Sequence, residues 1–332
     1  MKSRQWTAEK ISEMCRGYQR SCVLVAAAEL ELYDHLGQGW SSAEELAGKI
    51  AADPRAIGVL LDALAALELL DKRQDHYQAP GSLRNIMSTA TTGSLLAMLQ
   101  HQANCLRSWA QLAAVVKRGQ PAARQPSIRG PDADYAAFIE AMDNIARSTA
   151  PELVRQLQPL SFKHLLDVGG GSGSYTLAFL RAHPESKATL FDLPQVMEQA
   201  RRRLQQAGLL DRVTLVPGDF HTDTLPLGAD LAWVSAIVHQ NSREQNRRLF
   251  ERIFAALPSG GQILIRDFLM DDSRTAPLAG ALFAINMLVN TPGGGTYTVA
   301  ELSQDLSAAG FTDIRPLKQD DTMHSVLSAR KP

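Results

Sequence analysis

The stretch Leu165–Leu180, LLDVGGGSGSYTLAFL, decides the fold of the second half of the chain. A short apolar run contains Asp167, glycines crowd positions 169–173, and helix-forming residues resume directly afterwards. Glycine adopts backbone conformations with positive φ and lets the backbone approach a neighbouring group closely. The order of strand, glycine-rich turn and helix predicts a ligand-binding loop at the carboxyl end of a buried strand.

Around this stretch, short apolar strands alternate with helices from residue 163 onward. This is the βαβ pattern of a parallel sheet with helices on both faces, and continuously apolar strands are typical of such a buried sheet. The expected strands are HLLDV (164–168), ATLFDL (188–193), VTLVPGDF (213–220), LAWVSAIVH (231–239), QILIRDFL (262–269), TDIRPLKQ (312–319) and MHSVLSARK (323–331). Helices are expected to about residue 182, through residue 206 and over 242–256. We therefore predict an α/β fold, a Rossmann-like parallel sheet ending in a C-terminal antiparallel hairpin.

The first part of the chain is predicted to be helical with one hairpin. Apolar residues recur at helical spacing over 8–31, SSAEELAGKI (41–50) opens with a serine N-cap, and DPRAIGVLLDALAALELL (53–70) is amphipathic. DKRQDHYQAP (71–80) reads as two short strands around a polar tip. This order predicts an all-helical, winged-helix-like domain over 1–90.

Two long helices, 92–121 and 132–158, are expected to follow the first domain, joined by a connection rich in proline and glycine. We assign residues 91–158 to a helical linker whose helices cover the substrate, and residues 159–332 to the ligand-binding domain.

A winged helix can bind DNA, but its candidate recognition helix offers Arg55 and then almost only apolar side chains. Base recognition needs polar and basic groups, so a ligand-sensing DNA-binding regulator is the disfavoured alternative. The apolar helix faces instead predict burial against a second copy, and hence a homodimer.

Composition narrows the class of protein further. The 332 residues carry a net charge of -1, which gives no overall attraction to nucleic acid or to an anionic membrane. Neither a signal peptide nor a membrane span is apparent, and the three cysteines have no metal-type spacing. We expect a cytoplasmic protein with reduced thiols and no metal.

The glycine-rich loop departs from the dinucleotide fingerprint G-x-G-x-x-G, because Ser174 occupies the place of the third glycine. This disfavours an NAD-dependent oxidoreductase. An acidic residue at the strand end, Asp167, suits a ligand that has an ammonium group and no phosphate. Asp192 ends the next strand, where a carboxylate accepts hydrogen bonds from both ribose hydroxyls.

Five motifs follow one another in order: LLDVGGGSGSYTLAFL, FDLPQV, VPGDF, the segment ending in His239 and ALPSGGQILIRD. In this order they resemble the two-domain S-adenosylmethionine-dependent O-methyltransferases of plant phenolic and bacterial secondary metabolism. The resemblance covers essentially the whole chain and implies an N-terminal winged-helix dimerisation domain. It also implies S-adenosyl-L-methionine as cofactor and a small-molecule substrate. By this resemblance the cofactor contacts are Asp167, Gly169, Gly171 and Gly173 at the methionine part, Asp192 at the ribose, Asp219 and Phe220 at the adenine, with Leu193 and Ser235 as further contacts.

Methyl transfer from a sulfonium is an in-line displacement, so the protein must position the acceptor and remove its proton. The pKa of a phenol is ~10 and that of a histidine is ~6.5, so a histidine is suited to act as general base at neutral pH. His239 is expected at the cofactor edge of the sheet, and the resemblance assigns it this role, with Asp267 as its supporting carboxylate. His221 is a competing base and His101 a candidate substrate contact.

Three positions depart from the family's pattern. The aspartate and tryptophan that commonly follow the histidine are Gln240 and Asn241 here, and a second supporting glutamate aligns near Thr296. The acceptor atom is therefore left open between a hydroxyl, which we expect, and sulfur, nitrogen or carbon, or a non-methylating reaction on the same fold. The expected substrate contacts are Phe138, Met142, Phe283, Asn286, Met287 and Asn290.

Overall fold

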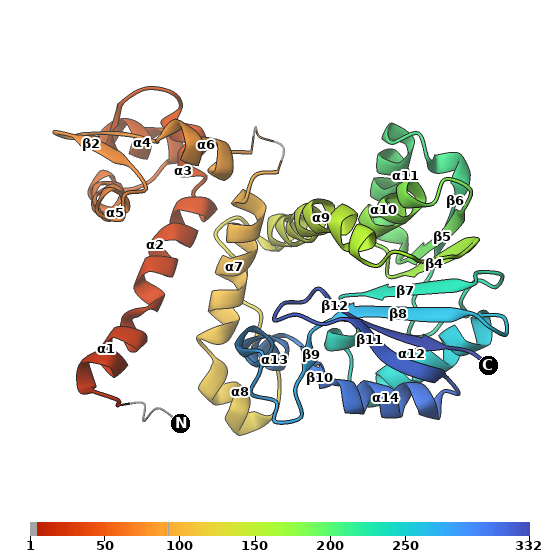
Figure 1. The fold of residues 1–332 in the computed structure, drawn as a ribbon. Coiled ribbons are helices and arrows are strands. Elements are labelled where there is room, and N and C mark those ends of the chain that lie inside the picture. Colours follow the sequence, from red (N-terminus) through yellow and green to blue (C-terminus); the bar gives the residue numbers. More distant parts are fainter. Residues whose placement is uncertain (1–4, 90, 92) are drawn as a thin grey trace. The chain divides into compact units, whose positions relative to one another are not determined.

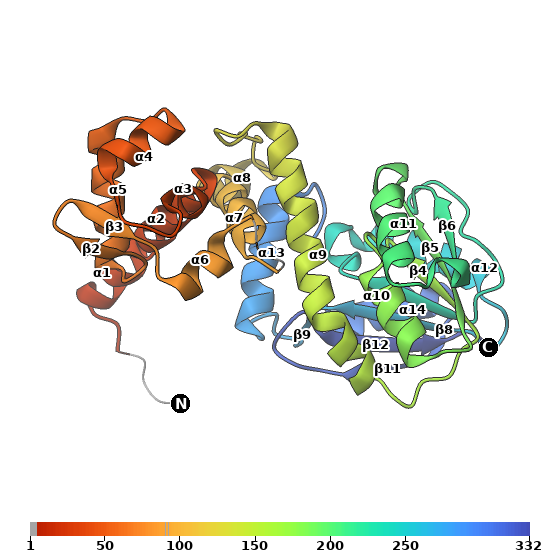
Figure 2. The same ribbon diagram turned by 90° about the horizontal axis from the view of Figure 1, so that it is seen from above.

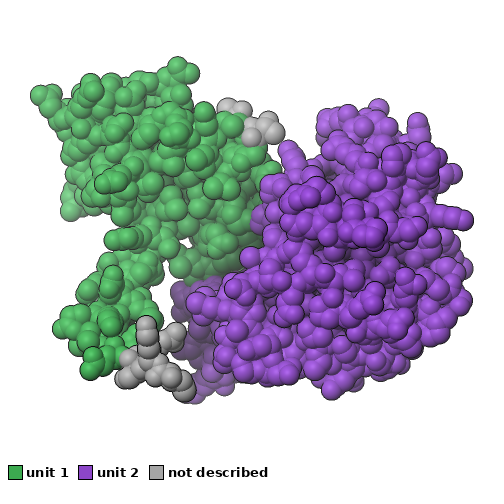
Figure 3. Space-filling view, viewed as in Figure 1, with its two compact units in different colours: residues 1–108, 124–144 green, residues 109–123, 145–332 purple. Residues whose placement is uncertain are grey.

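The computed structural model describes residues 5–89, 91 and 93–332 of the chain. Contacts divide the chain into two compact units, shown in different colours in Figure 3. Unit 1 comprises residues 1–108 and 124–144, and unit 2 comprises residues 109–123 and 145–332. Residue 90, the predicted end of the first domain, lies outside the described residues.

Unit 1 is helical apart from one small antiparallel sheet with strand order β1-β3-β2. Its elements are α1 (Ala8–Arg16), α2 (Tyr18–Glu29), α3 (Leu32–Leu36), β1 (Ser41–Ser42), α4 (Ala43–Ile50), α5 (Pro54–Ala66), β2 (Asp71–Arg73), β3 (His76–Gln78), α6 (Gly81–Met87), most of α7 (Leu96–Trp109) and the first part of α9 (Pro131–Gln156). The predicted hairpin at 71–80 is thereby confirmed as β2 and β3, the wing of this unit. A capping box between Ser42 and Glu45 starts α4, and the side chain of Asp53 caps α5.

Two expected helices are interrupted. The helix predicted over 8–31 consists of α1 and α2 on either side of Gly17, followed by α3 from Leu32. The prediction of one continuous helix over 92–121 was also wrong, because α7 ends at Trp109 and a separate helix, α8 (Leu112–Arg118), follows it. Gln111 lies at this break, and its side-chain amide both donates to and accepts from the backbone of Ala123. The returning chain therefore holds the break in place.

Unit 2 contains the predicted α/β fold. After α8 and the last part of α9, its elements are β4 (His164–Val168), α10 (Ser174–Ala182), β5 (Lys187–Asp192), η1 (Pro194–Val196), α11 (Met197–Gln206), η2 (Leu210–Arg212), β6 (Val213–Pro217), β7 (Leu231–Ser235), η3 (Val238–Gln240), α12 (Arg243–Ala256), β8 (Gln262–Asp267), β9 (Leu269–Met270), α13 (Leu278–Asn290), β10 (Tyr297–Thr298), α14 (Val299–Ala308), β11 (Thr312–Lys318) and β12 (Ser325–Arg330).

The seven-stranded sheet has the order β11-β12-β8-β7-β4-β5-β6. Strands β4 to β8 run parallel, whereas β12 pairs antiparallel with both β8 and β11, as the predicted C-terminal hairpin requires. Helices α10 and α11 lie on one face, and α12 and α14 lie on the other (Figures 1 and 2). The carboxyl ends of β4, β5, β7 and β8 therefore meet at one edge, where a ligand is expected.

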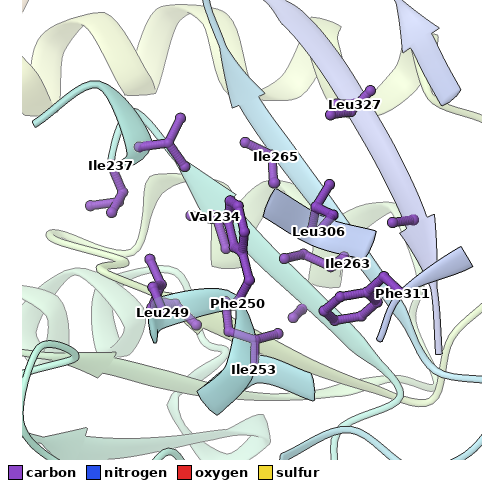
Figure 4. Close-up of a cluster of buried hydrophobic side chains, with 14 of the residues drawn as sticks. Val234, Ile237, Leu249, Phe250, Ile253, Ile263, Ile265, Leu306, Phe311 and Leu327 are labelled. Atoms are coloured by element: carbon purple, nitrogen blue, oxygen red, sulfur yellow. The ribbon is translucent and has the colours of Figure 1, made fainter. Parts of the chain in front are cut away.

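Successive residues of the buried strands point alternately into two hydrophobic cores, one on each face of the sheet. One core contains Val234, Ile265 and Leu327 from the strands together with Phe250 of α12 and Leu306 of α14, and Figure 4 shows it in close-up. The other core contains Trp233 and Leu264 packed against residues of α9, α10 and α11. This burial on both faces explains why the strands lack polar alternation. Among the described helices, none has the length and apolar character to cross a membrane.

Candidate active site

The loop after β4 needs glycine for two separate reasons. Gly169, Gly171 and Gly173 have φ of +69°, +54° and +80°, a region that side chains disfavour. In addition, a Cβ on Gly169 would lie 2.6 Å from Cδ1 of Ile237, and one on Gly170 would lie 2.8 Å from Cγ of Leu190. The bare backbone therefore passes close to the sheet edge, and Gly169 N–H is held there by the carbonyl of the β5 residue Phe191, at 2.8 Å.

Asp192, at the end of β5, fastens this loop. Its Oδ2 accepts a hydrogen bond from Gly171 N–H at 2.7 Å, and its Oδ1 accepts one from Leu193 N–H at the same distance. Burial raises the pKa of this carboxyl group above its ordinary value. Leu193 itself is exposed. The structure thus brings Asp192 to the glycine loop, as the sequence predicted, and its ribose-binding role remains a prediction.

Asp167 is buried one residue before the end of β4. Its Oδ2 accepts a hydrogen bond from the hydroxyl of Thr176 in α10 at 2.6 Å. Burial, with a smaller contribution from the nearby charge of Asp192, raises the pKa of Asp167 to about 7. Two carboxylates thus lie at neighbouring strand ends beside the glycine loop, an arrangement that favours a cationic ligand over a phosphate.

Asp219 and Phe220 follow β6 at the same edge of the sheet. Asp219 Oδ1 accepts a hydrogen bond from His221 N–H at 2.8 Å, and the ring of Phe220 lies near Gly169. His221, the competing base, is exposed, and its ring packs at a tilt against that of Phe220 with a centroid distance of 4.5 Å.

The sequence pattern predicted that His239 ends a strand, and this prediction was wrong. Strand β7 ends at Ser235, and His239 lies in the 3-10 turn η3 beyond it. Ala236, directly after the last residue of the strand, has a φ of +57°, which turns the chain out of the strand. The apolar run 231–239 hid this turn, because continuous hydrophobicity does not mark where a strand stops.

The imidazole of His239 pairs with the carboxylate of Asp267 at the end of β8. Nδ1 lies 3.0 Å from Oδ1 and 2.9 Å from Oδ2, and both side chains are buried. Asp267 Oδ1 also accepts a hydrogen bond from Phe268 N–H at 2.9 Å, which fixes the carboxylate. Because the carboxylate engages Nδ1–H, Nε2 is the nitrogen that is free to accept a proton. Within the described ranges, no second carboxylate is hydrogen-bonded to His239, in agreement with the absence of one at Thr296.

A network of side-chain amides anchors the turn that carries His239. The Nδ2 group of Asn246, on α12, donates to the carbonyl of Val238 at 3.0 Å, and Asn246 Oδ1 accepts from Asn241 Nδ2 at 3.0 Å. Both asparagines are buried. Sequence reasoning singled out Asn241 as a departure but missed Asn246, although a second asparagine five residues later was the available signal.

A second support for this turn comes from the glycine run at 293–295. Gly295 N–H donates to the carbonyl of His239 at 2.9 Å. A Cβ on Gly294 would lie 2.5 Å from that same carbonyl oxygen, so only glycine allows this approach. Sequence reasoning had passed over these glycines.

The predicted substrate contacts fall into two groups. On α13, the ring of Phe283 meets His239 edge-on at a centroid distance of 4.9 Å, and Met287 is buried. Asn286 Oδ1 accepts hydrogen bonds from Trp109 Nε1 at 2.9 Å and from Asn290 Nδ2 at 3.2 Å, so its amide joins α13 to the segment before α8. Asn290 is exposed.

The other predicted contacts, Phe138 and Met142, are partly exposed residues of α9 in unit 1. The ring of Phe138 packs against His101 within that unit, with a centroid distance of 5.1 Å. All of these residues remain predictions as substrate contacts. In the part of the chain that the structure describes, no group of three or more histidine, cysteine or acidic residues gathers as a metal site.

Comparison with known proteins places this geometry in context. Residues 109–312 match the model of an O-methyltransferase domain, and residues 12–96 match that of an O-methyltransferase dimerisation domain. The chain is 30% identical over 316 residues to 3-hydroxy-5-methyl-1-naphthoate 3-O-methyltransferase of Streptomyces sahachiroi, covering 93% of this chain and 90% of that protein. It is 31% identical to the tetracenomycin polyketide synthesis 8-O-methyl transferase of Streptomyces glaucescens, covering 92% and 91% of the two chains. The structure is similar to that of human N-acetylserotonin methyltransferase in complex with S-adenosylmethionine, with a TM-score of 0.80, 28% identity, and coverage of 100% of this chain and 99% of that one.

Proposed function

The chain belongs to the family of S-adenosylmethionine-dependent O-methyltransferases, and from that membership we propose how its own residues perform the transfer. It is an enzyme that methylates a small-molecule hydroxyl with S-adenosylmethionine as donor. We propose His239 as the general base, and the observation that carries this role is its buried hydrogen bond to Asp267. The earlier alternatives of a DNA-binding regulator and an NAD-dependent oxidoreductase are not favoured.

The residues at the sheet edge fit the cofactor. A Cβ at Gly169 or Gly170 would collide with the sheet edge, whereas one at Gly171 would meet no atom within 4 Å, so the loop has open space at Gly171. The carboxylates of Asp167 and Asp192 suit a ligand with an ammonium group and two ribose hydroxyls. Asp219 and Phe220 would hold the adenine. When bound, the cofactor supplies an activated methyl group on a sulfonium sulfur.

Deprotonation is the task of this chain's own residues. The Nε2 atom of His239 accepts the proton of the acceptor hydroxyl, so that the oxygen would be ready to take the methyl group and the donor would leave as the neutral thioether. Asp267 stabilises the imidazolium that forms and holds its ring in one orientation. Because a phenol is mostly protonated at neutral pH, this base increases the fraction that can react.

We propose an aromatic hydroxyl as the acceptor. One named relative is a 3-O-methyltransferase of a hydroxynaphthoate, and the other is an 8-O-methyl transferase of tetracenomycin polyketide synthesis. The ring of Phe283 beside His239 gives a planar acceptor a surface for edge-to-face packing. A screen of aromatic alcohols, thiols and amines with methyl-labelled donor tests this. Labelled aryl ether together with S-adenosylhomocysteine supports the proposal, and transfer only to nitrogen or sulfur contradicts it.

We propose a homodimer formed through unit 1. The match to a dimerisation domain supports it, and so does the first helix, α1, which buries none of its residues. Ile11 and Met14 of α1 and Tyr18 at the start of α2 are 52%, 66% and 57% exposed. Light scattering at micromolar concentration should give twice the chain mass, and a mass of one chain would contradict the proposal.

A further inference from the structure

Arg266 is a buried cation that the mechanism above does not use. It precedes Asp267 on β8, but alternation along the strand directs its side chain to the opposite face of the sheet. Only 5% of the residue is exposed. Nη1 donates to Ser235 Oγ at 3.2 Å, and Nη2 donates to His324 Nδ1 at 3.1 Å. Both partners are uncharged acceptors in this arrangement, and within the described residues no carboxylate forms an ion pair with this guanidinium.

The Tyr175 ring lies beside this guanidinium, and the Trp233 ring lies beside Tyr175. Its Cζ lies 5.5 Å from the ring centroid of Tyr175, and that ring lies 5.0 Å from the ring of Trp233. In the described part of the chain, Arg266 Nε, the Tyr175 hydroxyl and Trp233 Nε1 are buried without a hydrogen-bond partner. Guanidinium and indole nitrogens can only donate. We refer to Arg266, Tyr175, Trp233, Ser235 and His324 as the Arg266 cluster.

Burying a guanidinium without a counter-charge strongly disfavours the folded state, because the lost hydration is not replaced. Unsatisfied donors add to that cost. A group that carries negative charge and several acceptor atoms would complement the whole cluster, and a carboxylate meets both requirements with a geometry that matches the guanidinium fork.

The cluster lies at the cofactor edge of the sheet. Tyr175 is in the first turn of α10, directly after the glycine loop, and Ser235 ends β7. Strand β7 runs between β4 and β8, with Trp233 opposite Asp167 and Ser235 opposite Arg266. On this face of the sheet, therefore, a carboxylate and a guanidinium flank one strand at its carboxyl end. Their opposite charges complement the ammonium and carboxylate of an α-amino acid.

We propose that Arg266 binds the carboxylate of the methionine part of S-adenosylmethionine, with Asp167 on the ammonium side. This inference rests on the proposed function and adds a residue that the sequence motifs did not indicate. It also gives a reason for the predicted role of Ser235 at the cofactor site, since the Ser235 hydroxyl holds the guanidinium at the strand end.

The test compares two ligands that differ only in this carboxylate. S-adenosylhomocysteine carries it, whereas the decarboxylated analogue, 5′-(3-aminopropylthio)-5′-deoxyadenosine, keeps the amine and lacks the carboxylate. By calorimetric titration, Arg266→Met should weaken S-adenosylhomocysteine about 10- to 100-fold and change the affinity of the analogue less than about twofold. Arg266→Lys keeps the positive charge but lacks the forked guanidinium. It should therefore show a smaller loss of affinity for S-adenosylhomocysteine, again with little change for the analogue. It carries the test if the Met variant does not fold.

Arg212 provides a matched control, because its guanidinium is also largely enclosed but is satisfied by the backbone carbonyls of Leu180, His183 and Ser186. Arg212→Met should lower the melting temperature and affect the two ligands equally. Equal losses for both ligands in a folded Arg266 variant, or an unchanged affinity for S-adenosylhomocysteine, would overturn the inference. Wild-type protein that binds neither ligand would instead contradict the proposed function itself, together with this inference.

Discussion

The Nδ1 atom of His239 lies within 3.0 Å of both carboxylate oxygens of Asp267, at the carboxyl edge of the sheet. The pair is buried, so water does not compete for the hydrogen bond. This relationship gives the imidazole one orientation and one tautomer, which is what a general base requires.

Asp267→Asn should lower kcat for a hydroxyl acceptor by about 10²–10⁴-fold. The side-chain amide of asparagine can donate to Nδ1, which would place the proton on Nε2 and block the accepting nitrogen. Steady-state kinetics with the acceptor found by screening measures this. The dissociation constant of S-adenosylhomocysteine serves as control and should stay unchanged. A variant that retains full turnover would show that the carboxylate does not support the base.

Asn246→Leu should lower kcat about 10-fold or more, because the turn carrying His239 loses its bond from Val238 to α12. The substitution keeps a similar volume but removes the amide. Glu244→Ala, at an exposed position of the same helix, is the matched control and should be silent. If both variants turn over at the wild-type rate, Asn246 has no role in positioning the histidine.

Asp192→Ala should weaken binding of S-adenosylmethionine by roughly 1.5–3 kcal/mol, the usual range for hydrogen bonds to a charged group. The carboxylate is expected to hold the ribose, and it fastens the glycine loop through Gly171. Calorimetric titration measures the change, with the exposed Asp211→Ala as control. An unchanged affinity in a folded variant would exclude Asp192 from the cofactor site.

Asp167 should make the ligand-free protein less stable as the pH rises. Its pKa is raised to about 7 in the folded state, against roughly 3.9 when unfolded. Between these values the folded state holds the extra proton, so stability is greatest below pH ~4, falls through this window by an amount on the order of 4 kcal/mol and is flat above it.

Asp167→Asn should remove this slope while keeping an oxygen that can accept from Thr176. The melting temperature of the variant, relative to that of the wild type, should therefore rise as the pH increases from 5 to 8. A constant difference between the two proteins across that range would contradict the assignment.

The sequence was enough to predict the α/β fold and the glycine loop, because strand burial and positive φ each leave a local pattern. It also pointed to Asp192 and His239, since parallel strands bring their carboxyl ends together. It could not locate the end of β7, because an apolar turn looks like more strand. The break after Trp109 was missed for a related reason, since it depends on Gln111 binding the distant Ala123.

The support of His239 by Gly295, and the lack of a charge partner for Arg266 among the described residues, were beyond sequence reasoning, because both are decided by segments far apart in the chain. The support by Asn246 is more local, since Asn246 lies eight positions after Val238. The pair of Asn241 and Asn246 gave a hint, because a buried amide needs a partner.

The central claim is that His239 removes the acceptor's proton. Its most direct test is the turnover of His239→Ala with a hydroxyl acceptor, measured beside the affinity of the same protein for S-adenosylmethionine. We predict a kcat lower by about 10²–10⁴-fold with an unchanged dissociation constant, because a base that acts in the transition state leaves ground-state cofactor binding intact. Methylation of the hydroxyl at the wild-type rate would contradict the claim and make His221 the next residue to test.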